Sequence, residues 1–331
     1  MNDRAVSLLE QYELNITRTY KGRGCILCET EEGLKILQEY HAPQQKLVLM
    51  EHLLKNVSAL GLVDVDSLVP NKEGTYTVKD RDGVTYVLKD YYEGHECNPK
   101  NREELSDCIH TMALLHTGMF YPKEEALGDI ARFDLKEETA RHNRMLRKIR
   151  KYVRERGSKT AFEQFLLSEY DVFLKRAEAA EERICKEDFT SFYQEVEKQR
   201  SFVHGDFQYH NVLMCGQRRA VVNFERCRFD SRIGDLALFL RKIMEKYEWD
   251  MLLGEKMIQE YEAFTPLKEA ERRQLFYRLS YPEKFRKIVS TYYNSNKAFQ
   301  SLVYGEKLMA VCAQEEKKQN FLRKVFDDVI E

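Results

Sequence analysis

The pattern of hydrophobic and polar residues predicts a strand-rich region followed by a helix-rich one. Residues 13–92 contain short runs in which apolar and polar positions alternate, separated by turns that hold glycine. Within this region, Asp82-Gly83 signals a hairpin turn. After Pro43, apolar residues recur every three or four positions instead, which indicates one amphipathic helix. The region is therefore predicted to be a small antiparallel sheet with a single helix, in the order β-β-β-α-β-β.

The rest of the chain has a different period. From Pro99 onward the apolar residues keep a helical spacing almost to the C-terminus. Only FVHGDFQYHNVLM and AVVNFE interrupt it with short strand-like runs. A chain of 331 residues is long enough for two lobes. We therefore predict an α+β protein with an N-lobe at residues 1–92 and a mainly helical C-lobe at residues 93–331, joined by a hinge near residues 88–95.

Composition and charge exclude several classes of protein. The net charge of -2 gives no sign of the basic surface that nucleic-acid-binding proteins carry, so no nucleic-acid partner is expected. No apolar run reaches the roughly 18 residues of a membrane span, and the N-terminus lacks the pattern of a secretory signal. The eight cysteines are spread along the chain, and Cys25 and Cys28 have no second pair to complete a zinc site. We therefore expect reduced cysteines and a cytoplasmic protein.

The segment HGDFQYHN, residues 204–211, carries the most specific chemistry. Asp206 and Asn211 lie five positions apart on a loop between two apolar runs. Phosphoryl transfer requires a carboxylate to orient the attacking hydroxyl and an oxygen ligand to hold the metal ion. One loop that carries both groups would present them on the same side of a site. The spacing therefore favours a phosphotransferase.

With this loop and this order of lobes, the sequence resembles the kinase-like superfamily of aminoglycoside phosphotransferases and choline kinases. The segments GDLALFLRK and LSYPEKFRKIVSTYYNSNKAF narrow the resemblance to CotS-type spore-coat proteins, and the likeness covers essentially the whole chain. It implies a two-lobed protein-kinase-like fold and a location in the mother-cell cytoplasm and the spore coat. The site roles that it implies are catalytic base for Asp206, metal ligand for Asn211, structural residue of the loop for His204 and brace of the loop for Asp235.

The sequence departs from the family pattern at the second metal ligand. Where the family has an aspartate that binds magnesium, this chain has Asn223, whose neutral amide cannot supply the charge that this hard cation prefers. Glu225 lies two residues further on, and strand alternation would point it to the same side as Asn223. Glu225 could partly substitute as a ligand, or it could be an exposed carboxylate at the end of a strand.

A second departure concerns the lysine that family members place on the third strand to hold the nucleotide phosphates. Aligning ILQEY with the usual ending of this strand puts Gln38 at that position. Lys35 lies three positions away, which is the opposite face of a strand. The usual helix partner of the lysine would lie near Glu51, which could equally be a solvated residue.

Further nucleotide contacts are implied by the same resemblance. Gly22 and Gly24 could let backbone amides approach phosphates, although the same turn could be a plain hairpin. Lys89 and Tyr91 follow the last predicted strand of the N-lobe, where the backbone of the family's hinge pairs with adenine. Each of these residues is predicted to touch nucleotide only if the site is functional.

These departures leave two interpretations of function. The favoured one is a spore-coat-associated kinase-like protein with a degraded nucleotide and metal site, a pseudokinase or very weak phosphotransferase that binds ATP and Mg2+ weakly. The alternative is an active ATP-dependent phosphotransferase acting on a small molecule. A protein kinase is disfavoured because no activation-loop signature follows VVNFE.

The segment 141–156 is predicted to be a strongly basic helix. It contains eight arginines or lysines and a single acid, Glu155. Such a face is either simply solvated or a docking surface for an anionic partner, such as another spore-coat protein.

Overall fold

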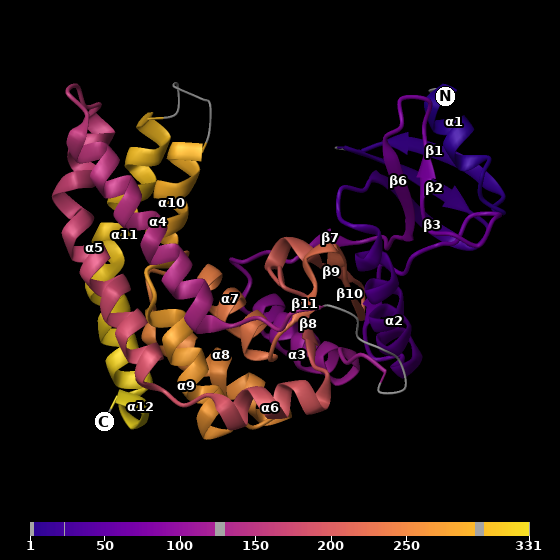
Figure 1. Cartoon of the computed structure of the whole chain (residues 1–331). Coiled ribbons are helices and arrows are strands. Elements are labelled where there is room, and N and C mark those ends of the chain that lie inside the picture. Colours follow the sequence, from indigo (N-terminus) through magenta and orange to yellow (C-terminus); the bar gives the residue numbers. More distant parts are fainter. Residues whose placement is uncertain (1–2, 23, 123–129, 295–300, 331) are drawn as a thin grey trace. The chain divides into compact units, whose positions relative to one another are not determined.

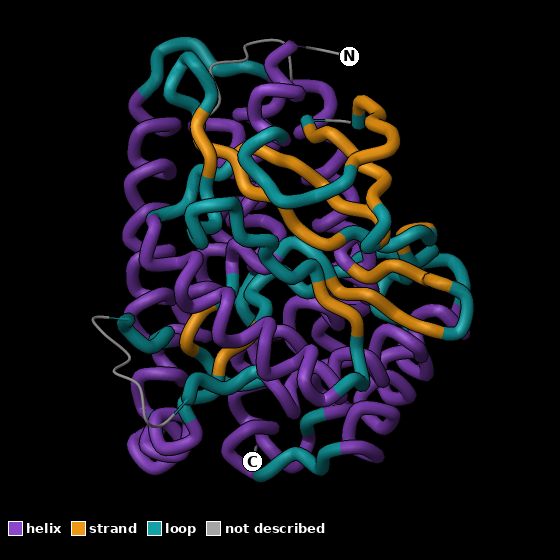
Figure 2. Tube along the Cα trace, turned by 90° about the vertical axis from the view of Figure 1, so that its right-hand side faces the viewer, coloured by secondary structure: helices purple, strands orange, loops and turns teal. Residues whose placement is uncertain are grey.

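The computed structural model describes residues 3–22, 24–122, 130–294 and 301–330 (Figure 1). The chain forms two compact units, one from residues 1–130 and 199–235 and the other from residues 131–198 and 236–331. All strands of the described residues belong to the first unit, and Figure 2 distinguishes them from the helices. The lobe boundary at residue 92 stays a prediction.

The first unit begins with helix α1 (Asp3–Leu9) and contains a five-stranded antiparallel sheet. Its strands, in spatial order, are β1 (Ile16–Lys21), β2 (Cys25–Thr30), β3 (Gly33–Glu39), β6 (Thr85–Asp90) and β5 (Val78–Lys79). Helix α2 (Gln44–Leu60) buries Leu47 in a cluster with Val87 of β6, as its helical period requires. The β-β-β-α-β-β order expected from the sequence is therefore present in this unit.

A smaller sheet in the same unit brings distant segments together. Its order is β4 (Asp64–Val65), β10 (Arg218–Val221), β9 (Val212–Cys215) and β7 (His95–Glu96). Strand β10 runs parallel to β4, with Val221 opposite Val65. Asp66, which follows β4, consequently lies beside Val222, which follows β10. The two-residue β4 is absent from the predicted elements.

The remaining elements of the first unit carry and support the predicted catalytic loop. Strand β8 (Phe202–Val203) pairs with β11 (Arg228–Phe229), and helix α3 (Arg102–Gly118) begins at Asn101, whose side chain accepts from the amides of Glu103 and Glu104. Such a cap satisfies amides that have no partner inside the helix. Helix α7 (Ile233–Met244) begins in this unit and continues in the second.

The second unit is helical. It contains α4 (Leu135–Glu155), α5 (Ala161–Lys186), α6 (Thr190–Gln199), α8 (Met251–Phe264), α9 (Glu269–Ser280), α10 (Glu283–Asn294), α11 (Ser301–Val325) and α12 (Asp327–Ile330). One core cluster joins Leu146 of α4, Tyr170 and Phe173 of α5, and Phe285 of α10, whose ring stacks on that of Phe173. No helix among the described residues has the length and apolar character that a membrane crossing requires.

Most arginines of the basic helix, α4, are neutralised by α5. Arg147 pairs with Glu178 at 2.8 Å and with Glu181 at 3.3 Å, while Arg150 and Arg154 both reach Asp171. Within the described part of the chain, the exposed side chains of Arg144 and Lys148 make no ion pair. The free positive charge of this helix is therefore smaller than its sequence suggests. Its use as a docking surface stays a prediction.

Lys318 of α11 is a buried cation at the end of another helix. Its ammonium donates to the carbonyls of Tyr281 at 3.0 Å and Ser280 at 3.3 Å, just at the C-terminus of α9. Burial lowers the pKa of Lys318 to about 8, and the nearby carboxylates of Glu315 and Glu245 offset this only in part. The folded protein therefore holds this proton less tightly than the unfolded chain does.

We expect this lysine to make stability rise with pH relative to a variant that lacks it. Between about pH 8 and 10.5 the unfolded lysine keeps a proton that the folded one has released, so the cost of burying its charge disappears as pH rises. The unfolding free energy of the native protein, minus that of Lys318→Met, should increase by about 3 kcal/mol across this window. Urea unfolding of both proteins at a series of pH values measures the difference. A difference independent of pH would contradict the assignment.

Candidate functional site

The loop at residues 204–211 connects β8 to β9 and is fixed from its first residue. The ring of His204 is fully buried; its Nε2 lies 2.9 Å from the carbonyl oxygen of Val222, and its Nδ1 accepts from the amide of Asp206 at 3.2 Å. Nε2 is therefore the protonated nitrogen that donates to Val222. The side chain of His204 thus connects the loop to Val222, just after β10, and its role as a structural residue stays a prediction.

Asp235, at the start of α7, holds the backbone of the same loop. Its carboxylate is fully buried and accepts from the amide of His204 at 2.7 Å, the amide of Gly205 at 2.8 Å, and Nε2 of His116 at 3.2 Å. Burial raises the pKa of this carboxyl, but the hydrogen bond and the attraction from His116, with the amide hydrogen bonds, outweigh it and leave the pKa of Asp235 below its ordinary value. Asp235 thus contacts the backbone of the loop at two residues, and its predicted bracing role stays a prediction.

Gly205 could not be another residue without moving the backbone. It has a φ of +77°, and a Cβ here would lie 2.1 Å from the carbonyl oxygen of Arg226. The loop therefore packs directly against the segment that follows Asn223. This contact brings the predicted base and the predicted metal position into one neighbourhood.

The carboxylate of Asp206 is partly accessible to solvent and makes only weak contacts with its neighbours. Its Oδ1 accepts from Nε2 of Gln208 at 3.2 Å, and its Oδ2 lies 3.7 Å from the guanidinium of Arg226. Nδ2 of Asn211 donates to the backbone carbonyl of Asp206 at 2.8 Å, which fixes the spacing between the two residues. No short ion pair therefore holds this carboxylate among the described residues, and the role of Asp206 as catalytic base stays a prediction. Arg226 was not singled out by the sequence.

Asn223 and Asn211 bind each other. Nδ2 of Asn223 donates to Oδ1 of Asn211 at 2.9 Å. Asn223 follows β10 in a left-handed conformation, with φ 71° and ψ 58°, which asparagine and aspartate tolerate better than most residues. Oδ1 of Asn211, the atom that would bind a metal ion, consequently already accepts a hydrogen bond from the side-chain amide of Asn223.

Glu225 belongs to a group of charged and polar side chains that we call the Lys89 cluster: Lys89, Asp66, Glu225 and Gln38. The ammonium of Lys89 is fully buried and binds both Oδ2 of Asp66, at 3.0 Å, and Oε1 of Glu225. Nε2 of Gln38 donates to the same Oε1 at 2.9 Å. Gln38 and Glu225 are therefore brought together as site neighbours, but through a direct hydrogen bond rather than through nucleotide or metal.

Charge is shared unequally inside the Lys89 cluster. Burial alone would lower the pKa of Lys89, but the two carboxylates outweigh it and raise that pKa. Burial raises the pKa of Glu225, and the adjacent ammonium more than reverses this, so its pKa is lowered. The pKa of Asp66 is raised, by burial and by repulsion from Glu225. Lys89 is thus held as a cation that Glu225 needs as its counter-ion.

The other predicted nucleotide residues are engaged within the unit. Lys35 pairs with Asp90 at 2.7 Å, and the carboxylate of Glu51 accepts from Lys55 and Tyr76 rather than from Gln38. Lys35 and Glu51 therefore do not form the lysine–glutamate pair that the resemblance implies.

The backbone that was predicted to pair with adenine is also hydrogen-bonded. The amide of Tyr91 donates to Leu34 and that of Asp90 to Ser67, each at 2.9 Å. The amide of Gly22 donates to Cys25 at 2.9 Å, and Gly24 has a φ of +73°, as in a tight hairpin turn. Their predicted roles in nucleotide binding stay predictions.

The donor set fits a magnesium ion poorly. Magnesium demands near-octahedral oxygen ligands and usually one or two carboxylates. Here Asn211 faces an amide, Asn223 offers no charge, and Glu225 is held by a buried ammonium. Among the residues that the structure describes, no group of three or more His, Cys, Asp or Glu side chains could hold a metal. The predicted roles of Asn211, Asn223 and Glu225 as metal ligands stay predictions.

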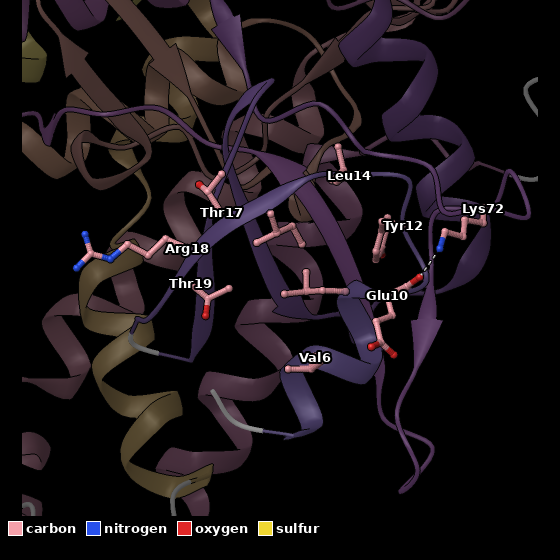
Figure 3. A pocket seen from close by; sticks show the side chains of 10 residues that line it. Val6, Glu10, Tyr12, Leu14, Thr17, Arg18, Thr19 and Lys72 are labelled. Atoms are coloured by element: carbon pink, nitrogen blue, oxygen red, sulfur yellow. Dashed lines mark hydrogen bonds between the residues drawn. The ribbon is translucent and has the colours of Figure 1, made fainter.

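A separate hollow of about 510 Å³ lies beside α1 and β1 (Figure 3). Its apolar lining includes Leu9, Tyr12 and Ile16, and at its rim Lys72 donates to the carbonyl of Glu10 at 2.7 Å. The sequence singled out none of these residues. The hollow is therefore distinct from the predicted site.

Comparison with solved structures identifies the fold. An aminoglycoside phosphotransferase from Alicyclobacillus acidocaldarius subsp. acidocaldarius DSM 446 matches with a TM-score of 0.82 and 20% identity, over 98% of this chain and 96% of its own. Spectinomycin phosphotransferase APH(9)-Ia, in complex with ADP and spectinomycin, matches with a TM-score of 0.67 and 10% identity, over 95% and 98%. The microcompartment-associated aminopropanol kinase matches with a TM-score of 0.60 and 18% identity, over 96% and 98%. The predicted two-lobed, kinase-like α+β fold is thereby confirmed.

Comparison with protein families gives a match to almost the whole chain. The family described as "Spore coat putative kinase YutH" matches residues 5–325. The match includes the loop at 204–211, Asn223 and Asp235, so the site described above lies within it. The resemblance inferred from the sequence is confirmed: this chain belongs to the spore-coat kinase-like family YutH.

Proposed function

We propose that this chain is a spore-coat-associated kinase-like protein whose nucleotide and metal site is degraded, making it a pseudokinase or a very weak phosphotransferase. The observation that carries the proposal is the 2.9 Å hydrogen bond from Asn223 to Asn211. It joins the two positions that the family pattern assigns to the metal. Two neutral amides satisfy each other there without any cation.

The energetic consequence of this arrangement is large. A metal ion that neutralises developing charge on a phosphoryl group contributes several kcal/mol, and each 1.4 kcal/mol corresponds to a factor of about ten in rate. Gln38 adds to the loss, because a neutral amide replaces a cation that would attract phosphates. The commitment of Gln38 to Glu225 supports the proposal further.

The alternative is an active ATP-dependent phosphotransferase for a small molecule, and one observation favours it. Asp206 is present, its carboxylate is partly accessible, and Asp235 and Asn211 hold its loop firmly. A general base needs this combination of an accessible carboxylate and a fixed backbone. The small-molecule substrates named for the solved relatives, such as spectinomycin, suggest only the class of acceptor for this alternative.

The family suggests where such a protein works. We place it in the mother-cell cytoplasm and then in the spore coat, with other coat proteins as partners. On α4, Arg144 and Lys148 are the exposed cations that remain for an anionic partner. Pull-down of coat extracts with the native protein and with the Arg144→Ala/Lys148→Ala variant tests this docking face.

Calorimetric titration with ATP, with and without magnesium, tests the proposed function. We expect a dissociation constant above about 100 µM, which is weaker than about -5.5 kcal/mol, and less than a twofold change on adding magnesium. Spectinomycin phosphotransferase, whose structure holds ADP, is the positive control. Submicromolar binding that requires magnesium would reject the degraded site and favour the alternative.

A further inference from the structure

We propose that Lys89 is a built-in cation that holds Asp66 and Glu225 in place of a divalent metal, and that removing its charge opens a divalent-cation site. The inference deepens the proposed function, since it names what occupies the degraded site. It concerns residues of the first unit only: β6, the segment after β4 and the segment after β10.

The contacts of the ammonium are those of a cation between two anions. Nζ of Lys89 lies 3.0 Å from Oδ2 of Asp66 and also binds Oε1 of Glu225. The side chains of Lys89 and Asp66 are 0% and 3% exposed. Charges buried to this extent must be paired, because their desolvation costs several kcal/mol per ion. A divalent cation would attract both carboxylates more strongly than one ammonium does.

A second, independent observation points to an unfilled coordination position. Oδ1 of Asp66 is buried and has no hydrogen-bond partner among the residues that the structure describes. Buried carboxylate oxygens are nearly always satisfied, so such an atom requires an explanation. Lysine bonds one oxygen of this carboxylate and leaves the other alone, whereas a metal ion can take both oxygens of a carboxylate. The orphaned atom belongs to Asp66, the more deeply buried of the two carboxylates that bind the ammonium.

Backbone pairing holds these groups in register. The parallel pairing of β4 with β10 sets Asp66 beside Asn223, whose amide donates to Oδ2 of Asp66 at 2.8 Å. Glu225 follows two residues later. Its side chain is 27% exposed, so an ion has a path to the cluster from solvent. The carboxylates are thus preorganised, and Lys89 is the group that fills the space between them.

The expected behaviour follows from replacing the ammonium with an apolar chain of similar length. In Lys89→Met, two carboxylates remain close together in a buried position, which is unfavourable until a cation binds or a proton is taken up. We expect MnCl2 or MgCl2, added without nucleotide, to raise the melting temperature of Lys89→Met by at least about 3 °C. The same salts should shift the native protein by less than about 1 °C.

Two matched variants test whether the carboxylates bind the ion. Lys89→Met/Asp66→Asn and Lys89→Met/Glu225→Gln each remove one anionic ligand, and both should lose the metal-dependent shift. Electron paramagnetic resonance of Mn2+ gives a direct readout, because Mn2+ should be immobilised by Lys89→Met and remain free with the native protein. If Lys89 had only a structural role, Lys89→Met would melt at a lower temperature than the native protein. It would then show neither the metal-dependent shift nor immobilised Mn2+.

The proposal can be overturned whether Lys89→Met is folded or unfolded without metal. A folded Lys89→Met with no metal-dependent shift, or a native protein with an equal shift, contradicts it. If Lys89→Met is unfolded in chelator, refolding with 10 mM MnCl2 is expected to recover its helical circular dichroism, and failure to do so also contradicts it. Because these measurements contain no nucleotide, tight binding of ATP to the native protein would reject the proposed function without changing their outcome.

Discussion

Replacing Asp235 with alanine is expected to lower the free energy of unfolding by about 3–5 kcal/mol. The fully buried carboxylate accepts from the amides of His204 and Gly205 and from Nε2 of His116. Alanine leaves these donors buried with no acceptor, and each unsatisfied group costs about 1–3 kcal/mol. Urea unfolding followed by circular dichroism measures the loss. We expect the loop at 204–211 to lose its fixed backbone first, because two of the lost bonds belong to it.

Two comparison variants separate this effect from a general loss of charge. Asp235→Asn keeps an oxygen that can accept one of the bonds, so its cost should lie between those of the native protein and Asp235→Ala. Glu306→Ala removes an exposed carboxylate that makes no ion pair among the described residues, and it should change stability by less than about 0.5 kcal/mol. If Asp235→Ala costs no more than Glu306→Ala, Asp235 does not brace the loop.

The parts of the fold that depend on local pattern could be predicted from the sequence. Strand alternation, glycine turns and the helical period after Pro43 are properties of neighbouring residues, and β1, β2, β3, α2 and β6 follow them. The loop at 204–211 could also be recognised from the sequence, because His204, Gly205, Asp206 and Asn211 all lie within eight residues of one another.

The Lys89 cluster could not be predicted in the same way. Asp66 reaches the site through the parallel pairing of β4 with a strand more than 150 residues later in the chain. A two-residue strand has no periodicity to reveal that pairing. One signal was available: in β6, Lys89 lies on the same face as Val87, which is fully buried. A lysine on a buried face of a strand indicates an internal counter-ion.

The charge of α4 shows a second limit of sequence reasoning. The basic residues are obvious, but their neutralisation depends on which helix lies alongside. Only the antiparallel packing of α4 and α5 places Arg147 against Glu178 and Glu181. Such surface pairs contribute little to stability, about 0–1 kcal/mol each. They do, however, reduce the charge available to a partner, which composition alone cannot reveal.

The variant Asn223→Asp/Gln38→Lys is expected to bind ATP·Mg at least about tenfold more tightly than the native protein, a gain of about 1.4 kcal/mol. Asn223 already has the left-handed conformation that aspartate tolerates, so the new carboxylate needs no change of backbone. It would face Oδ1 of Asn211, which now accepts from the amide of Asn223, and two facing oxygens favour a cation between them. A lysine at position 38 would add positive charge beside Glu225 and the phosphates.

The two substitutions act on adjacent parts of one ligand, so their effects should not add. Asn223→Asp alone should strengthen the dependence on magnesium, because it restores an anionic ligand. Gln38→Lys alone should gain less, because its ammonium can pair with Glu225, in competition with Lys89. Asp206→Ala in the double variant is the matched control: binding should persist, because this predicted base is not one of the two residues that were replaced to rebuild the site. Calorimetry and thermal shift with ATP and MgCl2 measure these affinities.

If the double variant binds ATP·Mg no better than the native protein, Asn223 and Gln38 are not what weakens the site. The stronger cause is then that the backbone amides of Asp90 and Tyr91 already donate to carbonyls within the protein.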